Sequence, residues 1–168
     1  MKFFFLLIFY SSLAFSQDSS LYNSERIVYL LSKANQGEIL AAKHAHAKLK
    51  TREAKDFALM MIREHEANER EAQELIKRNG IIPQENSFGS ELDKKSNLAL
   101  TQILATSEEV DKLYLQSQIE IHKMLLNNLD NLYLPNVQEA SLRSFLIKTR
   151  EHVSHHLSSA QEILGKLK

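Results

Sequence analysis

Residues 51–80 read TREAKDFALMMIREHEANEREAQELIKRNG, and this stretch decides the fold class. Its apolar residues recur every three or four positions, which is the spacing of an amphipathic α-helix. Thr51 is a preferred N-cap at the start of the pattern, and Asn79 with Gly80 is a typical C-terminal stop. The apolar stripe also contains His65 and Asn68. The stretch therefore predicts a helix about 40 Å long with polar groups on its buried face.

Three further segments show the same helical spacing. They run from residue 23 or 24 to about residue 50, from about 107 to 133, and from beyond residue 136 to the C-terminus. Four amphipathic helices of this length favour a four-helix bundle. A shorter helix is expected over about 91–105. If it runs the length of the bundle it forms a crossover, as in ferritin-like folds, and if it packs across one end the order is up-down-up-down.

Two capping patterns and one helix break set the expected boundaries. Ser90 followed by Asp93 resembles a capping box for the short helix. A break is expected at residues 134–136, which include Pro135, and Asn136 with Glu139 resembles a capping box for the last helix.

Composition excludes several classes of site. The 168 residues suit a single domain, and 21 basic against 21 acidic side chains leave no net field to attract nucleic acid. The chain has no cysteine, which excludes disulfides, thiolate zinc sites and cysteine nucleophiles. A metal ion could be held only by His, Asp, Glu or Met side chains. We find no nucleophile elbow and no phosphate-binding loop.

The N-terminal residues MKFFFLLIFYSSLAFSQ resemble a signal peptide over 1–16, cleaved before Gln17. Its apolar run is too short to span a bilayer, and no later segment reaches the required length of about 20 apolar residues. We expect a short disordered segment over 17–23 and one domain over 24–168. The protein is accordingly predicted to be exported, without a transmembrane span, and to be periplasmic or associated with the outer membrane.

Ionisable residues interrupt the apolar stripe of each long helix. They are Glu38, His65, His122, and the pair His152 and His156. Burying such groups without partners costs several kcal/mol, roughly, so we expect them to be one another's partners. Counted at about 1.5 Å per residue from the first hairpin turn, Glu38 lies about 20 Å and His65 about 21 Å along the bundle. From the last turn, His122, His152 and His156 lie about 20, 25 and 31 Å away.

In the crossover topology these depths put all five groups in the middle third of the bundle. His152 and His156 are one turn apart and are expected to face inward, whereas His155 is expected in solvent. His44 and His46 lie off the centre of their stripe and are also expected in solvent. The acidic residues around His65, including Glu64 and Glu69, mostly follow the outer face and are expected to form surface ion pairs.

Two interpretations of the central cluster remain open. One carboxylate with three or four imidazoles suits zinc, iron, copper or nickel. Alternatively, Glu38 pairs with a histidine and Asn68, Gln118 or Tyr114 completes a hydrogen-bonded network without metal. A standard di-iron site is disfavoured because no histidine has a glutamate three residues before it.

The chain also resembles a known family. The segments QGEILAAKHA (36–45), FALMMIREHEANEREAQELIKRNGI (57–81), VDKLYLQSQIEIH (110–122) and HHLSSAQEIL (155–164) are similar, in order and spacing, to the exported bacterial family catalogued as domain of unknown function 4142. The similarity spans about 27–165. It implies an all-helical, ferritin-like protein that is labelled a periplasmic or outer-membrane protein and has no established activity. Its patterned positions carry over onto Glu38, His65 preceded by Glu64, Asp111, Tyr114, His122, and His156 followed by Leu157. His152 is not among them.

From the residues and the resemblance we predict an all-α protein, a ferritin-like four-helix bundle with one additional short helix in the crossover between helices 2 and 3. The leading hypothesis is an exported helical bundle of unestablished activity, whose Glu38, His65, His122, and His156 or His152 could hold a divalent metal ion, zinc, iron or copper, in a metal-buffering or envelope-stress role. The alternative is a module without metal that binds an envelope protein or a second copy of itself. An oxidase of unusual ligation is a third hypothesis, and no enzymatic activity is assigned.

Overall fold

The computed structural model describes residues 23–167, and this part of the chain is all-helical, without a strand. Its long helices are α1 (Ser24–His46), α2 (Arg52–Asn79), α3 (Ser87–Ala105), α4 (Val110–Asn128) and α6 (Ala140–Lys166). A π-helical turn, η2 (Leu129–Tyr133), and a short helix, α5 (Leu134–Asn136), follow α4. The predicted signal peptide over 1–16, and the predicted disordered segment except Asn23, lie outside the described residues.

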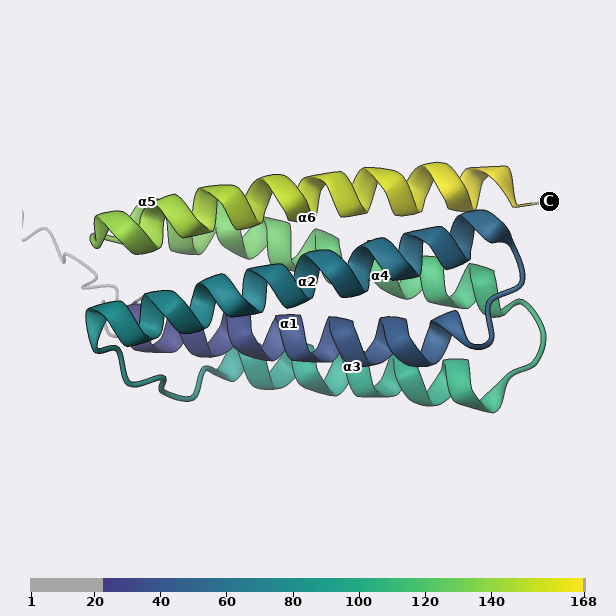
Figure 1. The fold of residues 1–168 in the computed structure, drawn as a ribbon, viewed down its shortest axis with the longest axis horizontal. Coiled ribbons are helices and arrows are strands. Elements are labelled where there is room, and N and C mark those ends of the chain that lie inside the picture. Colours follow the sequence, from purple (N-terminus) through teal and green to yellow (C-terminus); the bar gives the residue numbers. More distant parts are fainter. Residues whose placement is uncertain (1–22, 168) are drawn as a thin grey trace, which may run out of the picture.

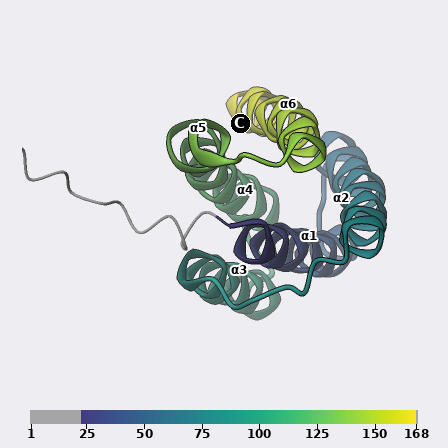
Figure 2. The same ribbon diagram turned by 90° about the vertical axis from the view of Figure 1, so that its left-hand side faces the viewer.

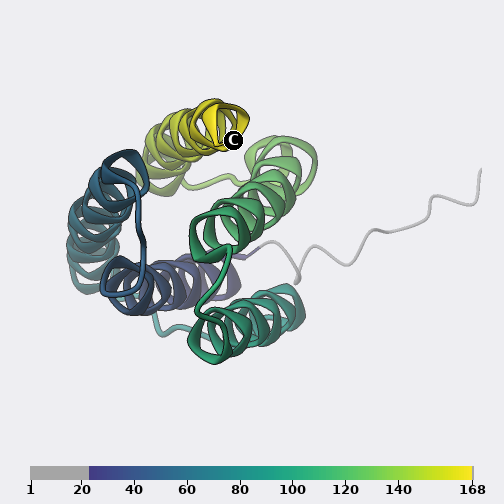
Figure 3. The ribbon, with the colours of Figure 1, turned by 90° about the vertical axis from the view of Figure 1, so that its right-hand side faces the viewer.

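The long helices lie side by side along one axis (Figure 1). α1 packs against α2, α4 packs against α6, and α2 also packs against α6. α3 lies against the outer side of α1, contacts α4, and returns the chain to the end where α1 joins α2 (Figures 1 and 2). That end, with the α1–α2 and α3–α4 connections, faces the viewer in Figure 3. The 81–109 segment therefore runs along the molecule rather than across one end of it.

The boundaries of α2 agree with the sequence pattern. The Thr51 hydroxyl accepts a hydrogen bond from the Ala54 N–H at 3.3 Å, as expected of an N-cap. Gly80 ends the helix in the left-handed region with a φ of 63°, which a glycine adopts without strain. α1 ends at His46 rather than near residue 50, and Thr51 is instead reached through a short non-helical turn.

The predicted start of α3 was wrong. The Asn86 side chain accepts hydrogen bonds from the Phe88 and Gly89 N–H groups at 2.9 and 3.2 Å, so the helix begins at Ser87. Ser90 lies inside the first turn, and its hydroxyl donates to the Asn86 carbonyl and to Glu85. Asn86, four residues before Ser90, is thus an equally good N-cap. α3 is 19 residues long, the same length as α4.

The end of the third predicted long helix also differs. The chain does not break at residue 134: it widens into the π-helical turn, where the Leu134 N–H bonds to the Leu129 carbonyl, and leaves the helix at Val137. Asn136 belongs to this last turn. The Glu139 carboxylate alone caps α6, by accepting from the Ser141 and Leu142 N–H groups at 2.9 and 2.6 Å, so the predicted Asn136–Glu139 capping box was wrong.

The buried core consists of two apolar clusters, one toward each end of the bundle. The first contains Ile27 and Leu31 of α1 with Leu142 and Phe145 of α6. The second gathers residues such as Leu49, Phe57, Met61, Tyr114 and Ala160. Except for Asp111, the buried polar residues of α1, α2, α4 and α6 lie near the boundary between these clusters in the sequence of each helix. Among the described residues, no helix is both long and apolar enough to cross a membrane.

Candidate metal centre

A buried polar layer separates the two apolar clusters. α1 contributes Asn35 and Glu38, α2 contributes His65 and Asn68, α4 contributes Gln118 and His122, and α6 contributes Thr149 and His156. Each of these residues is at most 8% exposed. These residues occupy inward-facing positions of the amphipathic helices. The same periodicity that buries the apolar side chains therefore also buries these polar groups.

Three histidines of this layer, His65, His122 and His156, come together from α2, α4 and α6. Their ring centroids lie 6.0 Å (His65–His122), 5.2 Å (His65–His156) and 5.3 Å (His122–His156) apart. One ring nitrogen of each lies within 4.8 Å of one ring nitrogen of each of the others. A tetrahedral metal ion with metal–nitrogen bonds near 2 Å needs these separations to be about 3.4 Å. Small side-chain rotations would close the difference.

The outward nitrogen of His65 is held by Asn35. His65 Nδ1 lies 3.0 Å from Asn35 Oδ1, and Asn35 Nδ2 donates to Asn68 Oδ1 at 3.1 Å and to Glu69 Oε2 at 3.3 Å. Because a carboxylate only accepts, the contact with Glu69 fixes the orientation of the Asn35 amide. Asn35 Oδ1 then accepts from His65 Nδ1–H, which leaves Nε2 as the nitrogen with the free lone pair.

The outward nitrogens of the other two histidines are also held by acceptors. His122 Nδ1 donates to the Gln118 backbone carbonyl at 2.8 Å, and His156 Nε2 donates to Glu64 Oε2 at 2.9 Å. The remaining nitrogens, His65 Nε2, His122 Nε2 and His156 Nδ1, are buried and have no hydrogen-bond partner. Each histidine thus keeps one proton on its outward nitrogen and one free lone pair.

Burial keeps the three imidazoles neutral. It is the main cause that lowers the pKa of His65 well below its usual value and the pKa of His122 to about 3. Burial also lowers the pKa of His156, although the Glu64 carboxylate acts in the opposite direction. Neutral imidazole is the form that binds metal ions, so at neutral pH no proton has to leave these groups before coordination.

Two carboxylates support the outward nitrogens of the histidines, one directly and one through an amide. Glu64 contacts His156 directly, and Glu69 acts on His65 through Asn35. A carboxylate or carbonyl behind each ligating histidine is the usual second layer of a metal site, because it fixes the ring and makes the free nitrogen more basic. The sequence pattern had placed Glu64 and Glu69 on the solvated outer face, and this prediction was wrong. Their long side chains reach inward from the edge of that face.

Glu38 does not join the three histidines in any group of described residues with ligand atoms within 4.8 Å. Asn35, one turn earlier in α1, is the residue that contacts His65, so Glu38 and His65 are not level. The depth count had treated residues 47–50 as helical, which they are not. Neither Glu38 carboxylate oxygen makes a hydrogen bond of normal geometry, and burial raises the Glu38 pKa to about 7 although the neighbouring Gln118 side chain acts to lower it. Burial, and to a smaller extent the Glu38 charge, raises the pKa of Tyr114.

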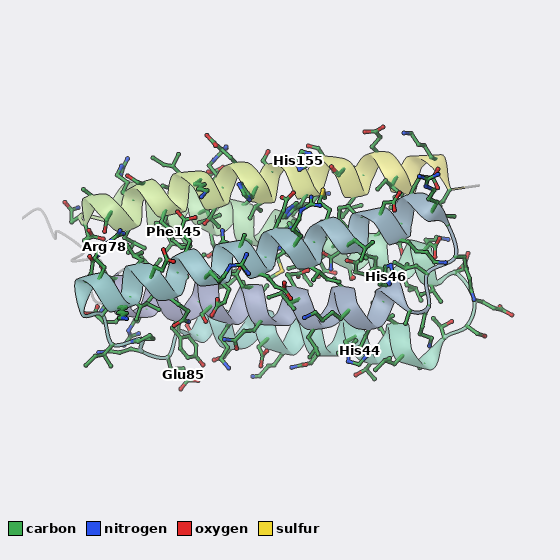
Figure 4. All side chains as sticks on the ribbon, viewed as in Figure 1. His44, His46, Arg78, Glu85, Phe145 and His155 are labelled. Atoms are coloured by element: carbon green, nitrogen blue, oxygen red, sulfur yellow. The ribbon has the colours of Figure 1, made fainter. Side chains whose placement is uncertain are left out.

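The remaining predicted histidines are less buried. His152 had been expected to face inward, and its Nδ1 is buried and lies 3.8 Å from Glu64 Oε2, but its side chain as a whole is 36% exposed. His155 and His44 are exposed and His46 is half-buried. Figure 4 labels His155 on α6, and His44 on the opposite, α1–α3 side of the molecule.

The histidine cluster adjoins a small cavity. The space open to the centre of a water-sized sphere is about 10 Å³, which is room for one water molecule or one ion. Its lining includes His65 and His156 from the cluster, Asn68 behind them, and Glu64 and His152 on the solvent side.

Asp111, which the resemblance also singles out, has a different place. Its carboxylate accepts hydrogen bonds from the backbone N–H groups of Lys50 and Thr51 at 2.7 and 2.8 Å, and from the Thr51 hydroxyl at 2.6 Å. These bonds lower its pKa against the effect of burial. Asp111 therefore fastens the α1–α2 turn to the start of α4.

Fold and site together define an all-helical protein with a buried cluster of three neutral histidines. The chain belongs to the family described as Domain of unknown function (DUF4142), whose sequence pattern matches residues 11–163. The family resemblance predicted from the four segments is thereby confirmed. Comparisons with curated proteins and with solved structures gave no match.

Proposed function

We propose that this protein is an exported, ferritin-like four-helix bundle that binds one divalent transition-metal ion through His65, His122 and His156. The observation that carries the proposal is the arrangement of the imidazole protons. Each ring donates its outward N–H to a fixed acceptor, the three remaining nitrogens are buried without a hydrogen-bond partner, and one nitrogen of each ring lies within 4.8 Å of one nitrogen of each other ring. Three convergent lone pairs are the ligand set of a metal site.

The metal-free network explains this arrangement less well. A hydrogen-bonded core needs a donor for every buried acceptor, since each unmet one costs about 1–3 kcal/mol. Glu38 was the proposed partner of a histidine, but it makes no hydrogen bond to one, and the side chain that lowers its pKa is that of Gln118. A single water molecule in the adjoining cavity could donate to only two of the three nitrogens. A cation accepts all three lone pairs at once.

The ligand set favours zinc or copper over iron. Imidazole suits all three metals, but non-haem iron sites combine two histidines with a carboxylate. Here the third ligand is a further imidazole, and Glu64 and Glu69 stand in the second layer, where they offset the charge of the ion. Three protein ligands leave a fourth position for water or a small molecule. A buffering role in the cell envelope fits a site of this kind and the signal peptide predicted over 1–16.

The second hypothesis, a module that binds an envelope protein or its own copy, has weaker support. The large exposed apolar residues are distributed over four helices and one loop rather than gathered in one patch: Leu40, Leu59, Ile82, Leu98, Leu104 and Ile147. Single exposed apolar residues are normal on protein surfaces.

The proposal is tested by zinc titration of the mature, chelator-treated protein in a calorimeter. His65→Asn and His122→Asn keep the bonds to Asn35 and Gln118, because the Asn amide nitrogen replaces Nδ1. His156→Gln keeps the bond to Glu64, because the Gln amide nitrogen replaces Nε2. Each variant removes only the inward nitrogen.

We expect one zinc ion per chain in the wild type and a loss of affinity of at least about 100-fold in each variant, since even second-layer changes cost 10–100-fold. The control variant is His44→Asn, which changes an exposed histidine outside the three-histidine cluster and should bind zinc as the wild type does. Absence of stoichiometric zinc and copper binding by the wild type, or unchanged affinity in the three variants, would refute the proposal.

A further inference from the structure

A second group of possible ligands lies directly outside the buried cluster. Glu64, His155 and His156 each offer one ligand atom, and these atoms lie within 4.8 Å of one another. In contrast to the three buried histidines, this group has two members that solvent can reach. His155 is exposed and the Glu64 side chain is 24% exposed. The two groups therefore form an outer and an inner set on the same side of the bundle.

His156 belongs to both sets and is oriented for both. Its Nε2 faces Glu64 at 2.9 Å, whereas its Nδ1 is the nitrogen left without a partner. Its ring centroid lies 6.1 Å from that of exposed His155 and 5.2 Å from that of buried His65. One imidazole thus has one nitrogen bonded to a member of the outer set and a second, buried nitrogen that is available to the inner set.

The small cavity described above is lined by members of both sets, although not by His155 or His122. Glu64 and His152 line it from the solvent side, and His65 and His156 line it from the inner side. Its volume of about 10 Å³ admits one ion without its hydration shell. A hydrated dication must therefore exchange water for protein ligands before it reaches the inner set, and that exchange is unfavourable in apolar surroundings.

We propose that Glu64, His155 and His156 form an outer capture site that takes a divalent metal ion from solvent and transfers it to the buried histidines. This inference rests on the proposed function. Glu64 supplies negative charge where the ion arrives, and His155 supplies an accessible imidazole. Capture uses Nε2 of His156 after its proton moves through water to Nδ1. Transfer to the inner set uses Nδ1 after that proton returns through water to Nε2, which restores the bond to Glu64.

The test variant is His155→Gln, because His155 contacts the inner set only through His156, whereas Glu64 also holds the inner ligand His156 in place. Zinc association and release are measured by stopped-flow mixing of the mature protein with zinc and with a chelator. We expect both rate constants to fall by about tenfold, with the dissociation constant unchanged. His44→Gln, an exposed histidine on α1, is the matched control and should retain both wild-type rates.

A second measurement isolates the outer set. In the double variant His65→Asn with His122→Asn, weak zinc binding should remain, and adding His155→Gln should abolish it.

The failures are distinguishable. Unchanged rates in His155→Gln overturn the capture site and leave the metal centre intact. If the zinc dissociation constant of His155→Gln is higher because release is faster, His155 only supports the inner site. That result also overturns the capture proposal. Absence of zinc binding by the wild type overturns the proposed function itself.

Discussion

The metal-free protein should lose stability on mild acidification because its buried histidines resist protonation. In the folded state burial lowers the His122 pKa to about 3, whereas the unfolded chain has the ordinary value near 6.5. As the pH falls below 6.5, the unfolded state takes up a proton that the folded state refuses. The contribution of His122 is therefore fully present above that pH and is lost progressively toward pH 3.

The size of the effect follows from these two pKa values. Between about pH 7 and about pH 5, a group with a pKa of 6.5 unfolded and about 3 folded reduces the free energy of unfolding by about 2 kcal/mol. The measurement is urea unfolding followed by circular dichroism, at both pH values and with a chelator present. The comparison variant is His122→Asn, which cannot titrate but keeps a donor for the Gln118 carbonyl.

Acidification should destabilise the wild type by about 2 kcal/mol more than the variant. The packing defect created by the smaller Asn is the same at both pH values, so it cancels in this difference. If wild type and variant lose equal stability between the two pH values, His122 is not a buried neutral group, and the account of the cluster is wrong.

Three further changes have defined expectations. Glu38→Gln should remove a pH dependence of stability whose sign is opposite to that of His122. Because burial raises the folded pKa of Glu38 to about 7, its carboxyl disfavours folding by about 3 kcal/mol more at pH 7 than at pH 4.5. If the difference in urea midpoint between variant and wild type is the same at both pH values, this expectation is contradicted. Asp111→Asn should lower the free energy of unfolding at neutral pH by about 3 kcal/mol, because it weakens the charge-assisted bonds to Lys50 and Thr51, and a loss below about 1 kcal/mol would refute that role. Gly80→Ala should lower thermal stability by about 1 kcal/mol through backbone strain alone, since no atom lies within 4 Å of the added Cβ; a neutral result in calorimetry would exclude the left-handed cap.

Periodicity and capping residues explain how much of the fold could be predicted. The stripe of α2 and its caps at Thr51 and Gly80 are local properties, and both caps were located correctly. Ser90 rather than Asn86 was predicted as the N-cap of α3, because the short polar segment contains several residues that could cap a helix. Only packing against α1 selects among them. The π-helical turn before Pro135 likewise gave no periodic signal.

The candidate site was predictable only in its inner residues. Histidines on an apolar stripe were expected to be buried, which is confirmed for His65, His122 and His156, whereas His152 on the same stripe is only half-buried. The residues that bond to the outward nitrogens of these histidines could not be predicted from the apolar periodicity. Glu64 and Glu69 reach the cluster through their long side chains, and Asn35 lies one position off the centre of its stripe. The family resemblance had pointed to Glu64, but periodicity alone could not. The depth of Glu38 depended on where α1 ends, and boundaries are the least certain part of such a pattern.

The most direct test of the central claim is anomalous diffraction from crystals of the mature protein soaked with zinc, with data on both sides of the zinc absorption edge. The account predicts one strong anomalous peak inside the bundle, about 2.0–2.1 Å from His65 Nε2, His122 Nε2 and His156 Nδ1. A weaker peak beside Glu64 and His155 would also locate the capture site. Zinc found only at surface positions, with the inner three nitrogens bonded to water or to one another, would contradict the account.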